Sequence, residues 1–287
     1  MQYVIAGLSS GGLYAILAVG LVMTYRSTRT LNFAQGEIAM ILAFVCYALL
    51  TNAGLSAFPA FVATAVAASA LGAFIYNVVI YPNRSKDHVK LAILTVGVQL
   101  ALIGLAALIW GPQAYVFPRL LGSDTYQFLG LRISSAFFWT LVSAFLCMAG
   151  VTLFLRFTNI GLAMRVASMD VNLAQLLGVN IRLVSTLAWV AASCLGAITG
   201  VLFSMGVYLN PYMMGMVILK AFAAVVLGGM NSVVGVFFGG LIVGLLEAGV
   251  AYAISPLLQD SVALVVIMFV LLVKPQGLFA GAGAWRA

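Results

Sequence analysis

The chain has 287 residues, of which 64% are hydrophobic and only 7% are charged. Soluble domains typically carry about 25% charged residues, so this composition excludes a protein with a water-covered surface and indicates one that lies in a lipid bilayer. The formal net charge of +7 is accounted for by the Lys and Arg that cytoplasmic loops of membrane proteins accumulate, so we expect no nucleic-acid partner.

Nine apolar segments follow one another along the chain, and their long continuous runs predict helices, not the alternating strands of a membrane barrel. They cover residues 3–25, 34–51, 58–80, 91–110, 136–155, 183–207, 216–229, 233–254 and 260–273. We therefore predict an all-α polytopic transmembrane bundle of about eight to ten spans, most simply nine, that forms one domain over residues 1–287. The first segment has no basic stretch before it and is predicted to be a retained helix, not a cleaved signal peptide.

Basic residues are distributed unevenly over the connections between these segments. The connections after the first, third and fifth segments are basic, whereas those at 52–57 and 208–215 contain no Lys or Arg. The positive-inside rule then places the N-terminus outside and the connection at 159–182 in the cytoplasm. The connection at 111–135 carries Arg119 and Arg132 although this topology places it outside.

The string NFAQGE interrupts the apolar sequence after the first segment. It contains Asn32, Phe33, Gln35, Gly36 and Glu37. One interpretation is a short cytoplasmic turn whose acidic residue opens the next helix, where it complements the helix dipole. The other is a discontinuous helix whose irregular backbone lines a polar translocation pathway, because irregular backbone at membrane depth is tolerated beside such a pathway. The residues leave both interpretations open.

Residues 159–182 form a polar segment that cannot cross a bilayer. It is predicted to fold as two short helices, 160–168 and 171–177, with Asp170 as the N-cap of the second and Gly178 as its stop. Leu162, Val166, Leu173, Leu176 and Leu177 would form an apolar side, with Arg165 and Gln175 facing outward and Asn172 beside the cap. Such a segment either lies on lipid headgroups or docks against another protein.

Residues 220–248 combine two intramembrane charges with closely spaced glycines. Charges inside a membrane are costly, so Lys220 and Glu247 are candidate functional groups. Counted from the turn near 229–232, they lie ~15 Å and ~22–25 Å along their helices, and this offset predicts no direct pair. The pairs of glycines spaced four apart predict close helix packing, within the chain or between subunits. These pairs are Gly235 with Gly239 and Gly240 with Gly244.

Metal and nucleotide chemistry find no support in the sequence. Cys46, Cys147 and Cys194 lie singly in apolar runs, and His88, the only histidine, sits in a basic connection as an expected solvated residue. No G-x-x-x-x-G-K-[ST] string occurs, so the chain cannot be its own nucleotide-binding subunit. We expect no metal, no cofactor of its own and no enzymatic activity.

Four strings, in order along the chain, resemble the branched-chain amino-acid permease family of ABC importers. They are GGLYAILAVGL (11–21) with NFAQGE (32–37), GLAMRVASMDVNLAQLLGVN (161–180), KAFAAVVLGGMNSVVGVFFGGLIVGLLEA (220–248) and KPQGLF (274–279). Val236 replaces the alanine of the third pattern, and residues 167–169 lack the further acidic residues that are frequent in the second. Each string is mostly Gly and aliphatic residues, and the specificity lies in the set.

The resemblance implies a permease subunit that carries branched-chain or other hydrophobic amino acids, or related small amides, across a bacterial inner membrane. It implies a second, related permease chain, two cytoplasmic ABC ATPases that use the ATP, and an extracytoplasmic substrate-binding protein. In this interpretation residues 159–182 are the coupling loop, with Arg165, Asp170, Asn172, Gln175 and Gly178 facing the ATPase. The alternative is an ion-coupled secondary carrier, for which Glu37, Lys220 and Glu247 are the candidate coupling groups.

Overall fold

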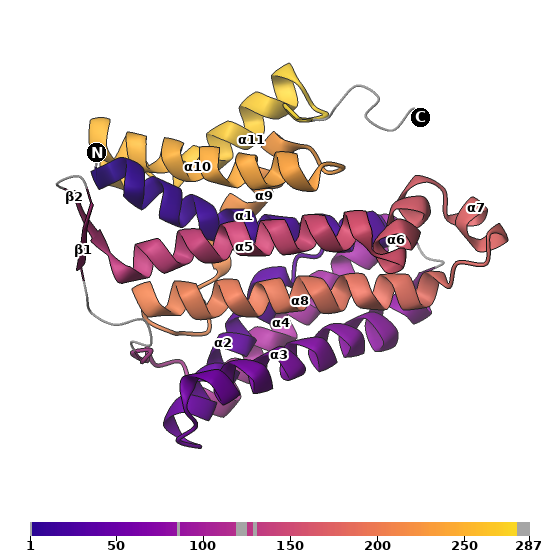
Figure 1. Ribbon diagram of the computed structural model, residues 1–287, viewed down its shortest axis with the longest axis horizontal. Coiled ribbons are helices and arrows are strands. Elements are labelled where there is room, and N and C mark those ends of the chain that lie inside the picture. Colours follow the sequence, from indigo (N-terminus) through magenta and orange to yellow (C-terminus); the bar gives the residue numbers. More distant parts are fainter. Residues whose placement is uncertain (1, 85–86, 119–124, 129–130, 280–287) are drawn as a thin grey trace.

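The computed structural model describes residues 2–84, 87–118, 125–128 and 131–279. Its helices run roughly side by side along the long axis of the molecule, as Figure 1 shows. The elements are α1 (Gln2–Thr28), α2 (Gln35–Thr51), α3 (Ala57–Phe74), η1 (Ile75–Ile80), η2 (Tyr81–Asn83), α4 (His88–Trp110), β1 (Thr125–Phe128), β2 (Leu131–Ser134), α5 (Ser135–Phe157), α6 (Asn159–Met169), α7 (Val171–Leu176), α8 (Ile181–Gly206), α9 (Gly215–Gly228), α10 (Val233–Ala253), η3 (Pro256–Leu258) and α11 (Ser261–Val273).

Each of the nine apolar segments forms a helix close to its predicted bounds, so the predicted polytopic helical bundle is confirmed. In the described part of the chain, six helices are long and apolar enough to cross a membrane. The remaining three apolar helices are shorter: Gln35–Thr51, Gly215–Gly228 and Ser261–Val273. Two of these short helices, α2 and α9, begin after irregular stretches of backbone.

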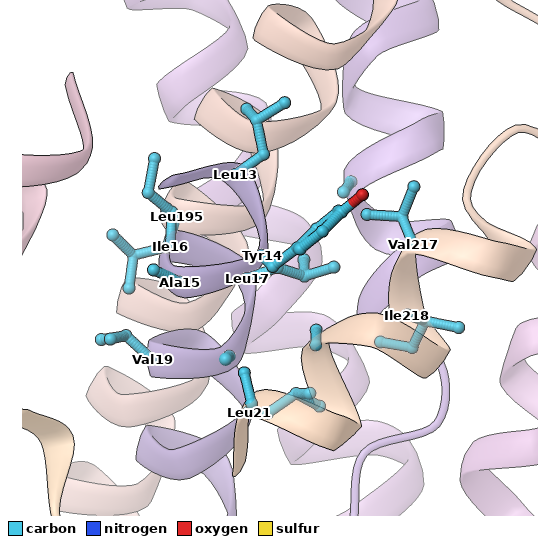
Figure 2. Close-up of a cluster of buried hydrophobic side chains, with 14 of the residues drawn as sticks. Leu13, Tyr14, Ala15, Ile16, Leu17, Val19, Leu21, Leu195, Val217 and Ile218 are labelled. Carbon is cyan, nitrogen blue, oxygen red and sulfur yellow. The ribbon is translucent and has the colours of Figure 1, made fainter. Parts of the chain in front are cut away.

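Helix α1 lies at the centre of the bundle. Its membrane-spanning window is 72% buried, more than that of any other long helix described, as expected for a helix that is apolar on all sides. It packs against α10, α8, α5 and α9. Figure 2 shows the Tyr14 ring extending from α1 toward the side of the core where Val217 and Ile218 of α9 lie. The first half of the chain is therefore held directly against the second.

Two features were not predicted. The end of the third apolar segment is the π-helix η1, and π-helical turns are frequent at functional sites. The connection at 111–135 contains a short antiparallel hairpin, in which Thr125 pairs with Ser134 and Phe128 with Leu131. Arg119 lies outside the described residues, and Arg132 lies in the second strand, opposite Gln127.

Several arginines gather at one end of the bundle. At this end, which we call the basic end, Arg26 of α1 and Arg29, just after that helix, donate to Ser168 of α6. Arg84 and Arg182 both approach the ring of Tyr81 there. At the other, the hairpin end, Tyr115 and Leu209 form an isolated β-bridge. The arrangement agrees with the basic connections sharing one side of the membrane.

Candidate functional site

The break at residues 29–34 turns the chain back into the bundle. The Gln35 side-chain amide donates to the carbonyl of Ala192 at 2.8 Å, and a Cβ on Gly20 would lie 2.9 Å from the same amide nitrogen. At 1.5 Å per residue, Gly20 and Ala192 lie ~12 Å and ~16 Å from the basic ends of their helices. Helix α2 therefore starts inside the bundle, roughly a third of the way along α1 and α8 from the basic end, and not in a surface turn. Its depth in a membrane stays a prediction.

Most polar groups of this break are satisfied, either within the break or by neighbouring helices, although Glu37 Oε2 is buried without a hydrogen-bond partner among the described residues. Asn32 donates to Gln35 and accepts from the backbone N–H of Ala34. From α4, Thr95 accepts the backbone N–H of Phe33 at 3.2 Å, and Gln99 donates to one Glu37 oxygen at 3.1 Å. Irregular backbone within a membrane requires such partners, because water is not there to supply them.

In this conformation the predicted pathway residues are packed, not open. Asn32, Gln35, Gly36 and Glu37 are buried and Phe33 is half-buried, with its ring 5.2 Å from that of Phe222 on α9. None of them lines the cavity at the hairpin end of the bundle. The break is thus a close crossing of helices, and a role in the pathway remains a prediction.

A second break of the same design precedes α9. The Asn210 side chain accepts the backbone N–H of Tyr212 at 2.9 Å, as the Asn32 side chain does with Ala34. The backbone carbonyl of each asparagine also accepts the backbone N–H three residues further on, at 3.3 Å. Asparagine is suited to this role because its side chain mimics a turn of backbone. The sequence carried a signal, Asn-Pro before a short apolar segment, that we did not interpret.

The two breaks meet. A Cβ placed on Gly36 would lie 3.2 Å from the Cβ of Ile218 and 3.3 Å from that of Met214. The first turns of α2 and α9 are therefore in contact inside the bundle, and the helices then run away from one another. Helix α2 continues toward the hairpin end, and α9 continues toward the basic end, where its last turn packs on the start of α10.

The two asparagines give a matched test of the burial of the first break. Asn32 is only 1% exposed. Replacing it by alanine leaves the buried N–H of Ala34 and Oε1 of Gln35 without their partner, and we expect a loss of about 1–3 kcal/mol in stability. Asn210→Ala removes the same bond at a partly exposed position, and its effect is expected to be clearly smaller. The thermal unfolding midpoints of both variants in detergent provide the measurement, and equal shifts would contradict the assigned burial.

The prediction that Lys220 and Glu247 do not pair is wrong. Lys220 of α9 forms an ion pair with Glu247 of α10 and a second one, at 2.8 Å, with Asp260. Because Cα–Cβ bonds tilt toward the N-terminus of a helix, the Lys220 side chain leans away from the α9–α10 turn and that of Glu247 leans toward it. Counting residues along the axes omitted both tilts. Tyr14 completes the cluster by donating to Glu247 at 2.8 Å.

The glycines of α10 serve two faces of that helix within the chain. Gly235 and Gly239 lie against Gly228 and Ala224 of α9. The other pair faces α1, since a Cβ on Gly240 would lie 2.6 Å from the Cα of Ala15 and one on Gly244 would lie 2.4 Å from that of Gly11. Of the two alternatives, packing within the subunit is therefore the one observed.

The segment at 159–182 folds locally as predicted. Asp170 separates α6 from α7 and accepts the N–H groups of Asn172 and Leu173 at 2.8 and 3.1 Å, which is the N-cap arrangement. Gly178 has φ of +80°, a conformation that glycine adopts readily after a helix. Gln175 is exposed, and Arg165 donates to the carbonyl of Arg156 at 3.5 Å.

The predicted apolar side of this segment is only partly right. The residues that pack on the bundle are small, namely Gly161, Ala167 and Ala174, and they join a minor core with Val184 of α8. Four of the five aliphatic residues assigned to the apolar side are exposed instead, and Arg165 is half-buried. The four exposed residues are Leu162, Leu173, Leu176 and Leu177. The segment thus presents leucines away from its own bundle.

Metal chemistry gains no support from the geometry. Within the residues that the structure describes, no group of three His, Cys, Asp or Glu side chains could hold a metal ion. His88 begins α4, and the three cysteines are free thiols separated in the fold.

A bundle of apolar helices with two interrupted helices and a buried charge cluster is typical of membrane transport proteins. The family described as the branched-chain amino acid transport system permease component matches residues 3–271. The chain therefore belongs to this family, and the match does not favour the ion-coupled alternative.

Curated relatives agree with the family match. The chain is 32% identical, over 97% of its length and 94% of theirs, to the high-affinity branched-chain amino acid transport system permease protein LivH of Escherichia coli. It is 31% identical to LivH of Salmonella typhimurium over the same shares and 33% identical to BraD of Pseudomonas aeruginosa, over 97% of this chain and 95% of BraD.

A solved structure has a similar fold. The structure of PsaBC from Streptococcus pneumoniae in complex with Fab matches with a TM-score of 0.51 at 15% identity, covering 96% of this chain and 93% of that one. At this identity the likeness concerns the fold alone.

Proposed function

We propose that this chain is one permease subunit of an ABC importer in a bacterial inner membrane, with its N-terminus outside. It carries branched-chain or other hydrophobic amino acids, or related small amides, that a substrate-binding protein delivers. A second, related permease chain and two cytoplasmic ATPases complete the transporter. The family match supports the cargo class, and the lack of a nucleotide-binding string in this sequence requires that ATP be used by partners.

The observation that carries the proposal is the surface of α6 and α7. Leu176 is 85% exposed and Leu177 66% exposed, in a segment that is too polar to enter the bilayer. In Figure 1, α7 projects beyond the ends of the long helices at the basic end. Exposed apolar patches with polar rims mark protein interaction sites, and the ATPase is the partner that must approach from this side.

The same segment is attached firmly to the bundle. Arg26 of α1 and Arg29, just after that helix, donate to Ser168 of α6, and a Cβ on Gly161 would lie 2.6 Å from the Cα of Leu155 in α5. A displacement of α6 by an ATPase would therefore be transmitted to α1 and α5 without loss in a flexible linker. Because α1 contacts α8, α9 and α10, the whole centre of the bundle would respond.

The translocation step would use the crossing of α2 and α9. In alternating access, discontinuous helices near the membrane midplane rearrange to expose a site to one side and then the other. The parts of this chain that would separate are the buried residues Asn32, Gln35, Gly36 and Glu37 and the half-buried Phe33. Exposed side chains next to the crossing, Tyr212 and Met216, would then face the second permease across the pathway.

A crosslinking experiment tests the docking surface. In a background lacking Cys46, Cys147 and Cys194, Leu176→Cys carrying a short photo-crosslinker is expected to form an adduct with the ATPase in native membranes. The control is Leu257→Cys, since Leu257 is 91% exposed in η3 at the hairpin end and should give no such adduct.

Two outcomes would oppose the proposal. If Leu176→Cys in the intact transporter crosslinks only to lipid or to this chain, α7 is not the docking surface. If uptake by the reconstituted chain alone follows an ion gradient, the protein is a secondary carrier.

A further inference from the structure

A cavity of about 560 Å³ opens at the hairpin end of the bundle. It lies between the first half of α1, the start of α5, the end of α8 and the last turns of α10. It extends along α1 from Tyr3 to Leu13, a depth of roughly 15 Å at 1.5 Å per residue. Neither the sequence patterns nor the proposed mechanism assigns it a role.

The inner part of this cavity is charged. Glu247, which is 8% exposed, lines it. The Glu247 carboxylate accepts a hydrogen bond from Tyr14 and forms an ion pair with Lys220. Lys220 also pairs with Asp260. One ammonium group thus faces two carboxylates, so these three groups together carry one excess negative charge. A carboxylate offers about four lone-pair positions, and the bonds that Glu247 accepts from Tyr14 and Lys220 occupy two of them.

The remaining walls are apolar with a few hydroxyl groups. Leu13, Leu202 and Phe203 form apolar surface, and Ser9 and Ser10 add hydroxyl oxygens. At the rim, Gln259 offers an amide group. A cavity of this size with mostly apolar walls and a few convergent polar groups has the usual character of a small-molecule site. A bare metal cation would make poor use of the apolar walls.

We propose that this cavity binds the transported amino acid on its way through the protein, with its α-ammonium group donating to Glu247. The ammonium would neutralise the excess charge of the cluster, the aliphatic side chain would lie against Leu13 and Phe203, and the carboxylate would point toward Gln259 and water. The inference rests on the proposed function for the cargo class and adds a site in this chain.

Protection of an engineered cysteine tests occupancy directly. In the complete reconstituted transporter lacking native cysteines, Ala251→Cys on the cavity wall is labelled with a membrane-impermeant thiosulfonate. Leucine-loaded binding protein is expected to slow labelling at least fivefold compared with unloaded binding protein. Val116→Cys, exposed outside the cavity, serves as the control and should react equally with both.

The chemistry is tested by Glu247→Gln, which leaves Lys220 paired with Asp260. Loss of a charge-assisted hydrogen bond to the ammonium should raise KM for leucine uptake about tenfold. If ATP-dependent uptake persists with KM unchanged and Ala251→Cys unprotected, this inference is overturned while the proposed function stands. If Glu247→Gln fails to assemble, the protection experiment alone decides. Uptake that needs no ATP would instead contradict the proposed function.

Discussion

Replacing Gly244 by alanine is expected to destabilise the bundle by about 3 kcal/mol, the upper part of the usual range for overpacking. A Cβ at this position would lie 2.4 Å from the Cα and the nitrogen of Gly11 and 2.4 Å from the carbonyl oxygen of Gly7. These are backbone atoms of α1, so no side chain can rotate away, and the two helices must separate. Small residues at such crossings are what allow membrane helices to approach closely. The measurement is the thermal unfolding midpoint in detergent.

Gly249→Ala is the matched control on the same helix, because nothing lies within 4 Å of a Cβ at that position. Alanine favours a helix over glycine by about 1 kcal/mol, so this variant should be as stable as the parent or more so. If the two variants lose stability equally, the close approach of α1 and α10 is not as described.

Replacing Lys220 by methionine is expected to cost about 3–5 kcal/mol, because removing one partner leaves an uncompensated buried charge. Lys220 is 7% exposed and Glu247 8% exposed, and the variant would leave Glu247 and Asp260 facing one another without a cation. The yield of monodisperse protein and its unfolding midpoint are the quantities to compare.

The double variant Lys220→Met with Glu247→Gln provides the control for side-chain volume. It removes the buried carboxylate charge together with the ammonium group, and most of the lost stability should return. A double variant as unstable as Lys220→Met alone would show that packing of the lysine stem, not charge, explains the loss.

The positions of the nine helices follow from the sequence because burial in lipid requires long apolar runs. The depth at which a helix begins does not follow in the same way. The segment at 34–51 had the same composition whether it started in a surface turn or inside the bundle. What distinguishes the two is the contact of Gln35 with Ala192, which are 157 residues apart.

The errors have specific physical reasons. For Lys220 and Glu247, distances along the helix axes were counted without the direction of the side chains. For α6 and α7, the apolar pattern correctly identified leucines on one side, but a pattern cannot tell which surface covers them. The residues of α6 and α7 that pack on the bundle are Gly161, Ala167 and Ala174 instead, and these are too small to dominate a hydrophobic periodicity.

The cavity at the hairpin end and the second break, before α9, could not be predicted as sites from the sequence. Glu247 was recognised as costly in a membrane, but the wall around it comes from four helices that are distant in the chain. Asn210 could have been found by comparison with Asn32, since each precedes a short apolar helix and forms the same turn.

The contact of Gly36 with Met214 and Ile218 has a consequence for how tightly the membrane is sealed. Because α2 leaves this contact toward the hairpin end and α9 toward the basic end, a rotation about it that opens space at one end would close space at the other. A pivot of this kind would keep small ions from leaking through during each cycle, so the cell could run the importer without dissipating its membrane potential.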